Sequence, residues 1–122
     1  MTYQEILNLQ ISNVIGSTSE YQELVKQCLS IVSTSTAKDN EIAMWISAAV
    51  EDMVRQGIDV ANNTSNGLIQ GAIVMFVKAN FGMCDKAEKE LAKERYLYIC
   101  TNLSLSSDFL LEGVDDEWFV HH

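Results

Sequence analysis

The chain has 122 residues, which is enough for one small domain with a single hydrophobic core. Its 17 acidic and 8 basic residues give a formal net charge of −9 at pH 7. This acidity argues against a protein that wraps nucleic acid, because phosphate binding needs a basic surface. The sequence contains no proline, and long helices form most easily without it because an interior proline costs about 3 kcal/mol.

Residues 3–15 are predicted to form a first helix, as part of an N-terminal helical extension over residues 1–18. Leu7, Ile11 and Val14 lie on one face of this helix. A helix this short is marginal alone and needs a surface on which to dock. We therefore interpret the stripe as a contact with a second subunit or a partner.

Two further helices are expected over residues 20–30 and 40–56. The stretch between them, residues 30–36, carries β-branched and hydroxyl side chains that favour extended structure, so a loop is predicted there. Gly57 is expected to end the second of these helices, with Ile58 packed back over the last turn in a Schellman motif.

Residues 67–82 are predicted to form the central helix of the protein. A helix that is apolar on nearly all sides must be covered on nearly all sides, and this one is too short for a bilayer, which needs about 20 apolar residues. Gly71 is expected to let a neighbouring helix come close, and Gly82 to end the helix in the left-handed conformation. The polar residues of this stretch are Gln70, Lys78 and Asn80.

The last long helix is expected over residues 86–104, with Asp85 as its cap. The first half of this helix is charged and the second half is apolar. Charged neighbours three and four residues apart support a helix and give it a solvated outer face. A salt-bridge surface between subunits is the alternative interpretation of this charge run.

The C-terminal stretch 108–122 is not predicted to be helical. It is acidic and yet carries large apolar side chains, which a purely solvated tail does not need. We interpret it as an arm that docks on another subunit or on a partner. Its expected anchors are Phe109, Leu110, Leu111, Trp118 and Phe119.

The sequence offers no constellation for catalysis, so we do not expect an enzyme. It has no glycine-rich phosphate loop and no histidine before residue 121, which argues against a Ser–His or Cys–His pair. Cys28, Cys84 and Cys100 form no CxxC motif and are expected to be free thiols in a reducing compartment. No cofactor, no metal site and no membrane contact is predicted.

These expectations combine into an all-α fold. We predict a small helical bundle of four to five helices around the buried central helix 67–82, with extended N- and C-terminal arms. The chain 1–122 is expected to be a single domain, with the helical extension 1–18, a helical core at 19–107 and the acidic aromatic arm at 108–122.

From about Leu24 to Phe109, the chain resembles the head–tail connector family of tailed bacteriophages, whose members are also termed head-completion or DNA-packaging adaptor proteins. The order and spacing of three sets of residues carry this resemblance, and Val-Lys-Ala-Asn-Phe-Gly at 77–82 is the most specific run. The sets are residues 39–42, 46–52 and 57–58, then residues 68–82, then residues 94–96 and 103–107.

The resemblance implies a structural virion protein in the neck of the particle, made in the cytoplasm of the bacterial host. Such adaptors form a homo-oligomeric ring, usually a dodecamer, beneath the portal protein. The ring extends the channel through which DNA passes without specific binding, and its lower face meets a stopper or tail-completion protein. A ring needs two different contact surfaces on each subunit, and the stripe in residues 3–15 and the arm 108–122 are the expected pair.

The sequence is also compatible with two other functions. One is a small cytosolic regulatory or scaffold protein that binds a partner through its C-terminal arm. The other is an acidic mimic of DNA, although the lysines mixed into residues 85–95 argue against charge spaced like phosphates.

Overall fold

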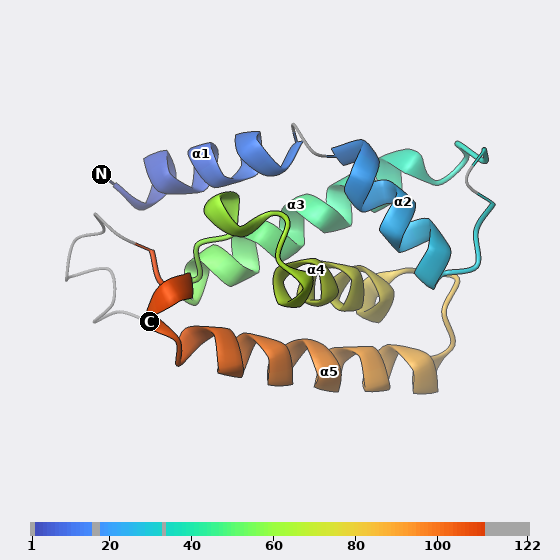
Figure 1. Ribbon diagram of the computed structural model, residues 1–122. Coiled ribbons are helices and arrows are strands. Elements are labelled where there is room, and N and C mark those ends of the chain that lie inside the picture. Colours follow the sequence, from blue (N-terminus) through green and yellow to red (C-terminus); the bar gives the residue numbers. More distant parts are fainter. Residues whose placement is uncertain (1, 16–17, 33, 112–122) are drawn as a thin grey trace.

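The computed structural model describes residues 2–15, 18–32 and 34–111, and within these ranges the chain is helical with one isolated antiparallel bridge. The predicted all-α bundle is therefore confirmed (Figure 1). The elements in chain order are α1 (Tyr3–Ile15), α2 (Thr18–Cys28), α3 (Asp39–Arg55), the 3₁₀ turn η1 (Ala61–Asn63), α4 (Gly67–Asn80), α5 (Lys86–Ser104) and the 3₁₀ turn η2 (Ser107–Phe109).

The starts of α4 and α5 follow from side chains that cap their first turns. The Asn66 side chain accepts a hydrogen bond from the backbone N–H of Leu68 at 2.8 Å, and the Asp85 carboxylate accepts one from Glu88 at 2.8 Å. These bonds satisfy backbone donors that have no partner inside the helix. Both helices accordingly begin where the sequence predicts, at residues 67 and 86.

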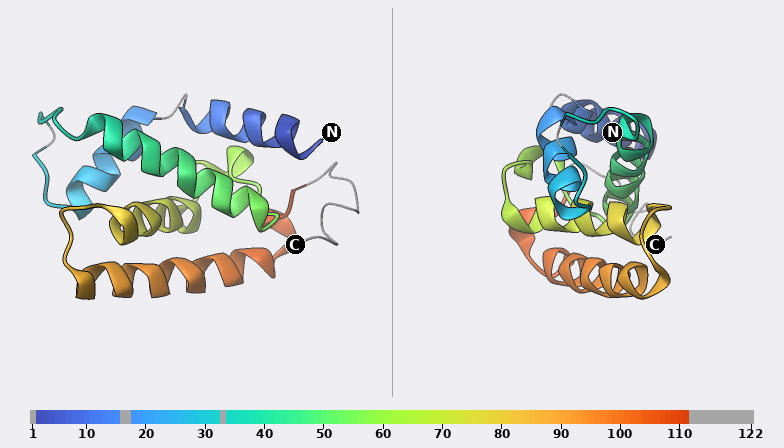
Figure 2. Two further views of the ribbon diagram at one scale, coloured as in Figure 1. Left: turned by 180° about the vertical axis from the view of Figure 1, so that it is seen from behind. Right: turned by 90° about the vertical axis from the view of Figure 1, so that its right-hand side faces the viewer.

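The helices are arranged with α4 in the middle of the molecule. Two views show α5 along one side of α4, while α2 and α3 lie on the other side (Figures 1 and 2). Helix α1 packs against α3 and against η1. The N-terminal helix is thus part of the body of the bundle, and the prediction of an extended N-terminal arm is wrong for residues 3–15.

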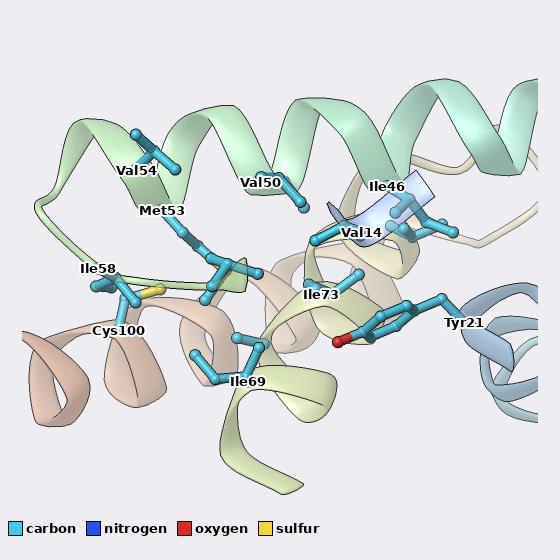
Figure 3. Close-up of a cluster of buried hydrophobic side chains, with 14 of the residues drawn as sticks. Val14, Tyr21, Ile46, Val50, Met53, Val54, Ile58, Ile69, Ile73 and Cys100 are labelled. Carbon is cyan, nitrogen blue, oxygen red and sulfur yellow. The ribbon is translucent and has the colours of Figure 1, made fainter. Parts of the chain in front are cut away.

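One continuous core joins the helices. Its fully buried side chains come from α1, α2, α3, α4 and α5 and from the connector after α3 (Figure 3). Burying a large aliphatic side chain contributes about 1.5–3 kcal/mol, so this core supplies most of the driving force for folding. The residues labelled there are Val14, Tyr21, Ile46, Val50, Met53, Val54, Ile58, Ile69, Ile73 and Cys100.

Gly57 ends α3 as predicted. Its φ of 85° lies in the left-handed region, and the N–H groups of Gly57 and Ile58 donate to the carbonyls of Val54 and Met53 at 2.9 and 3.0 Å. This pair of bonds is the Schellman motif. It turns the chain so that Ile58 enters the core.

A second motif of this kind ends α2, at a residue that the sequence analysis placed inside the helix. Ser30 has a φ of 59°, and the N–H of Ile31 donates to the carbonyl of Lys26 at 2.8 Å. Serine rarely adopts this conformation, so the sequence carries little sign of this end. The predicted helix 20–30 therefore ends two residues too late.

Two expectations about glycines in the central helix are wrong. Helix α4 ends at Asn80, and Phe81 leaves it in an extended conformation; among the described glycines only Gly57 has a positive φ. A Cβ on Gly71 would meet only the Ile99 side chain, at an ordinary 3.8 Å. Gly71 therefore marks open space on α4 and does not serve a close approach of two helices.

Candidate assembly surfaces

The structure places the predicted α1 stripe in the protein's own core. Leu7 and Val14 are buried at 6% and 1% exposure, and Ile11 packs partly buried against the same core. Their partners are side chains of this chain, because α1 lies along α3. In this arrangement the stripe offers no free face to a second subunit.

A buried glutamine fixes α1 to the connector after α3. The Oε1 atom of Gln10 accepts the backbone N–H groups of Val60 and Ala61 at 2.8 and 2.7 Å, and its Nε2 donates to Asp59 Oδ1 at 2.8 Å. All the hydrogen-bonding groups at the end of this side chain point at one connector. Because buried donors without partners are costly, this contact ties α1 to the bundle.

The described part of the C-terminal stretch, residues 108–111, is hydrogen-bonded to the chain that follows α3. The N–H of Leu111 donates to the Gly57 carbonyl at 2.9 Å, and the N–H of Asp59 donates to the Phe109 carbonyl at 2.7 Å. Leu111 is buried and Phe109 is partly buried, whereas Leu110 is 38% exposed. Trp118 and Phe119 lie outside the described residues.

Helix α4 is not covered on every side, although its sequence is apolar all round. Ile69, Ile73 and Val77 are fully buried, but Leu68 is 50% exposed. On that open side an apolar groove of about 500 Å³ runs between α4 and α5. We call it the α4–α5 groove, and its lining residues are Gly71, Met75, Leu91, Glu94, Arg95, Tyr98 and Ile99.

The outer face of α5 carries more exposed apolar surface than a solvated helix requires. Leu91 is 47% exposed, Tyr98 is 71% exposed and Leu105 is 80% exposed. Single exposed apolar residues are normal, but a contiguous patch marks an interaction site. Leu91 and Tyr98 form such a patch because both line the α4–α5 groove.

The basic side chains of α5 form no ion pair with the acidic residues that the structure describes. Within the described residues, the salt bridges are Lys26–Asp39 at 2.8 Å and Arg55–Glu51 at 3.2 Å. Lys86, Lys89, Lys93 and Arg95 are half of the eight basic residues in the sequence. None of these four has an acidic partner within 4 Å in the described ranges.

Tyr96 and Cys100 are titratable residues of α5 that are buried in the core. The Tyr96 hydroxyl donates to Asp52 Oδ2 and so joins α5 to α3, while the Tyr96 ring packs edge-on against Phe76 at 5.1 Å. Burial, with the neighbouring Cys100 thiol and the bond to Asp52, raises the pKa of Tyr96. Burial also raises the pKa of Cys100 to about 11, so this thiol stays protonated at neutral pH and is a weak nucleophile.

The described ranges contain no group of three or more His, Cys, Asp or Glu side chains placed to hold a metal ion. None of their helices combines the length and the apolar character needed to cross a bilayer.

A family model described as phage connector protein matches residues 23–109. Because this match spans more than half of the chain, the protein belongs to the phage connector family. It is therefore a structural component of a virion, assembled with other phage proteins. No curated protein matches the chain, and no solved structure does.

The residues of the α4–α5 groove are not among the predicted contact residues. The sequence predicts an α4 covered on nearly all sides, and it predicts a solvated outer face for residues 86–95, with a salt-bridge surface between subunits as the alternative. A usable signal was present in the spacing of Leu91 and Tyr98. These two residues are seven positions apart, which places them on one helix face, and that face differs from the one that buries Ala92, Tyr96 and Cys100.

Proposed function

We propose that this connector protein is the adaptor of the head–tail junction. Copies of it assemble as a ring, a dodecamer in the virion, beneath the portal protein. The ring extends the DNA channel and presents its lower face to a stopper or tail-completion protein. DNA passes this acidic wall without specific binding, because like charge prevents a phosphate backbone from adhering.

The observation that carries the proposal is the open α4–α5 face on a protein of the connector family. A ring is built from heterologous contacts, in which one surface of a subunit binds a different surface of the next. The α1 stripe packs inside the protomer, whereas the groove between α4 and α5 is an exposed apolar surface. Family membership also favours this role over the regulatory or scaffold alternative.

Electron microscopy of the protein mixed with its portal protein tests this function. We expect rings coaxial with the portal, and we expect the protein in the neck of purified virions by immunogold labelling. A protein that stays monomeric with the portal and is missing from virions would contradict the proposal. The free protein without portal serves as the control for self-assembly.

A further inference from the structure

We propose that the C-terminal segment of one copy, residues 112–122, binds in the α4–α5 groove of the next copy. This inference rests on the proposed function, because it names the two surfaces that join neighbouring subunits. It assigns the groove as the receiving surface and Trp118 and Phe119 as the inserted side chains.

The chemistry of the groove matches that of the segment. Met75, Leu91, Tyr98 and Ile99 make its walls apolar, and a volume of about 500 Å³ is large enough for aromatic side chains. Large aromatic anchors that fill a pocket dominate the binding energy of many interfaces. Gly71 leaves part of the groove floor open because no side chain projects from it.

Charge at the rim of the groove favours an acidic segment in one orientation. Arg95 lines the groove and forms no ion pair among the described residues. In the segment, the acidic run 115–117 directly precedes Trp118, so insertion of the aromatic residues brings carboxylates to the rim. Arg95 can then pair with a carboxylate or stack on an aromatic ring, whereas Glu94 repels the acidic run and directs it to the arginine side.

The length of the segment fits a contact between copies. Leu111 is fixed by its hydrogen bond to Gly57, and the seven residues from there to Trp118 extend over roughly 25 Å at most. That reach exceeds the diameter of a helix, which is about 10–12 Å, so the segment is long enough to extend to a subunit packed alongside. A segment bound in its own groove would fill that groove and make it unavailable to a neighbouring copy in a head-to-tail contact.

A complementation experiment with two full-length variants tests the proposal. The groove variant is Leu91→Glu/Tyr98→Glu, at positions that are 47% and 71% exposed, so its fold is expected to be unchanged. The segment variant is Trp118→Ala/Phe119→Ala. Each variant alone is expected to self-associate at least about thirtyfold more weakly than the unaltered protein, as for loss of an interface hot spot. An equimolar mixture is expected to form a one-to-one heterodimer, because one copy supplies the groove and the other supplies the segment.

Native mass spectrometry and analytical ultracentrifugation read the outcome. A mixture that contains no heterodimer overturns the proposal, whatever the state of the unaltered protein. The matched control is Leu97→Glu, since Leu97 is on the same helix, is 51% exposed and does not line the groove. We expect it to self-associate like the unaltered protein, and equal weakening by this control would also overturn the proposal.

Experiments with the portal protein distinguish the contact between segment and groove from the adaptor function. Rings on the portal that form normally with the groove variant would overturn the inference and leave the adaptor function intact. A heterodimer in the mixture, without any ring on the portal, would support the inference and contradict the adaptor function.

Discussion

Helix α1 and the α4–α5 face both carry apolar stripes in the sequence, but the structure uses them in opposite ways. Val14 of α1 is 1% exposed, whereas Leu91 of α5 is 47% exposed. The α1 stripe is covered because the helix lies along α3 and because Gln10 ties it to the next connector. Helices α4 and α5 pack against each other, but an apolar groove along this contact is left open. An apolar stripe thus indicates an interface only where no element of the same chain covers it.

Introducing a carboxylate into each stripe is the strongest test of this contrast. Val14→Asp is expected to destabilise the fold by more than about 4 kcal/mol, because it buries an unpaired polar group in the core. Leu91→Glu is expected to leave stability within about 0.5 kcal/mol, as for other exposed positions. Thermal unfolding followed by circular dichroism measures both. A Val14→Asp protein with an unchanged melting temperature would show that α1 does not pack on the core.

Removing the glutamine that holds α1 tests how firmly this helix is fixed. Gln10→Ala leaves the N–H groups of Val60 and Ala61 without their acceptor, and we expect a loss of about 2–4 kcal/mol in the free energy of unfolding. The control is Gln4→Ala, because Gln4 is exposed and bonds only to the exposed Asn8. Urea unfolding compares the two. Equal midpoints would mean that the Gln10 bonds do not stabilise the fold.

The helices themselves were predictable because their signals are local. The bounds of α1 and α5 match the predicted ranges 3–15 and 86–104, and the end of α3 follows from Gly57. Caps, apolar periodicity and a left-handed glycine all act within a few residues. The end of α2 was missed because a serine occupies the left-handed position there.

The open face was not predictable, because it depends on where distant helices lie. An apolar α4 is equally compatible with burial on all sides and with one exposed side. The choice is made by α5, which packs on α4 through side chains such as Tyr96, whose ring lies against Phe76, and leaves Leu68 exposed. Sequence periodicity gives the faces of one helix, but it does not say which neighbour covers each face.

The pH dependence of stability tests whether Tyr21 of α2 is buried in the core. Burial, with a smaller contribution from Glu20, raises the pKa of Tyr21 from 10 to about 12. The folded state thus keeps this proton between pH 10 and pH 12, while the unfolded state loses it. The contribution of Tyr21 to the free energy of unfolding is therefore fully present below pH 10 and is lost as the pH rises through this window.

The Tyr21→Phe variant isolates this effect. It is expected to lose about 1 kcal/mol at neutral pH, because the hydroxyl bonds to the Thr64 carbonyl at 2.8 Å, and to unfold with a shallower pH dependence between pH 10 and pH 12. Tyr98→Phe is the control, since Tyr98 is 71% exposed. Urea unfolding at several alkaline pH values measures the slope, and an identical slope in both variants would contradict burial of Tyr21.

Two glycines are expected to respond in opposite ways to the same substitution, because their surroundings in the structure differ. Gly71→Ala is expected to stabilise the protein by up to about 1 kcal/mol, because alanine is the better helix former and the new Cβ meets only Ile99, at 3.8 Å. Gly57→Ala is expected to destabilise it by roughly 1–2 kcal/mol, because a φ of 85° is unfavourable for any side chain. Opposite shifts of the urea midpoint are therefore expected from the same substitution. If Gly71→Ala were the destabilising one, α4 would have a close neighbour on its open side, and the groove would not exist.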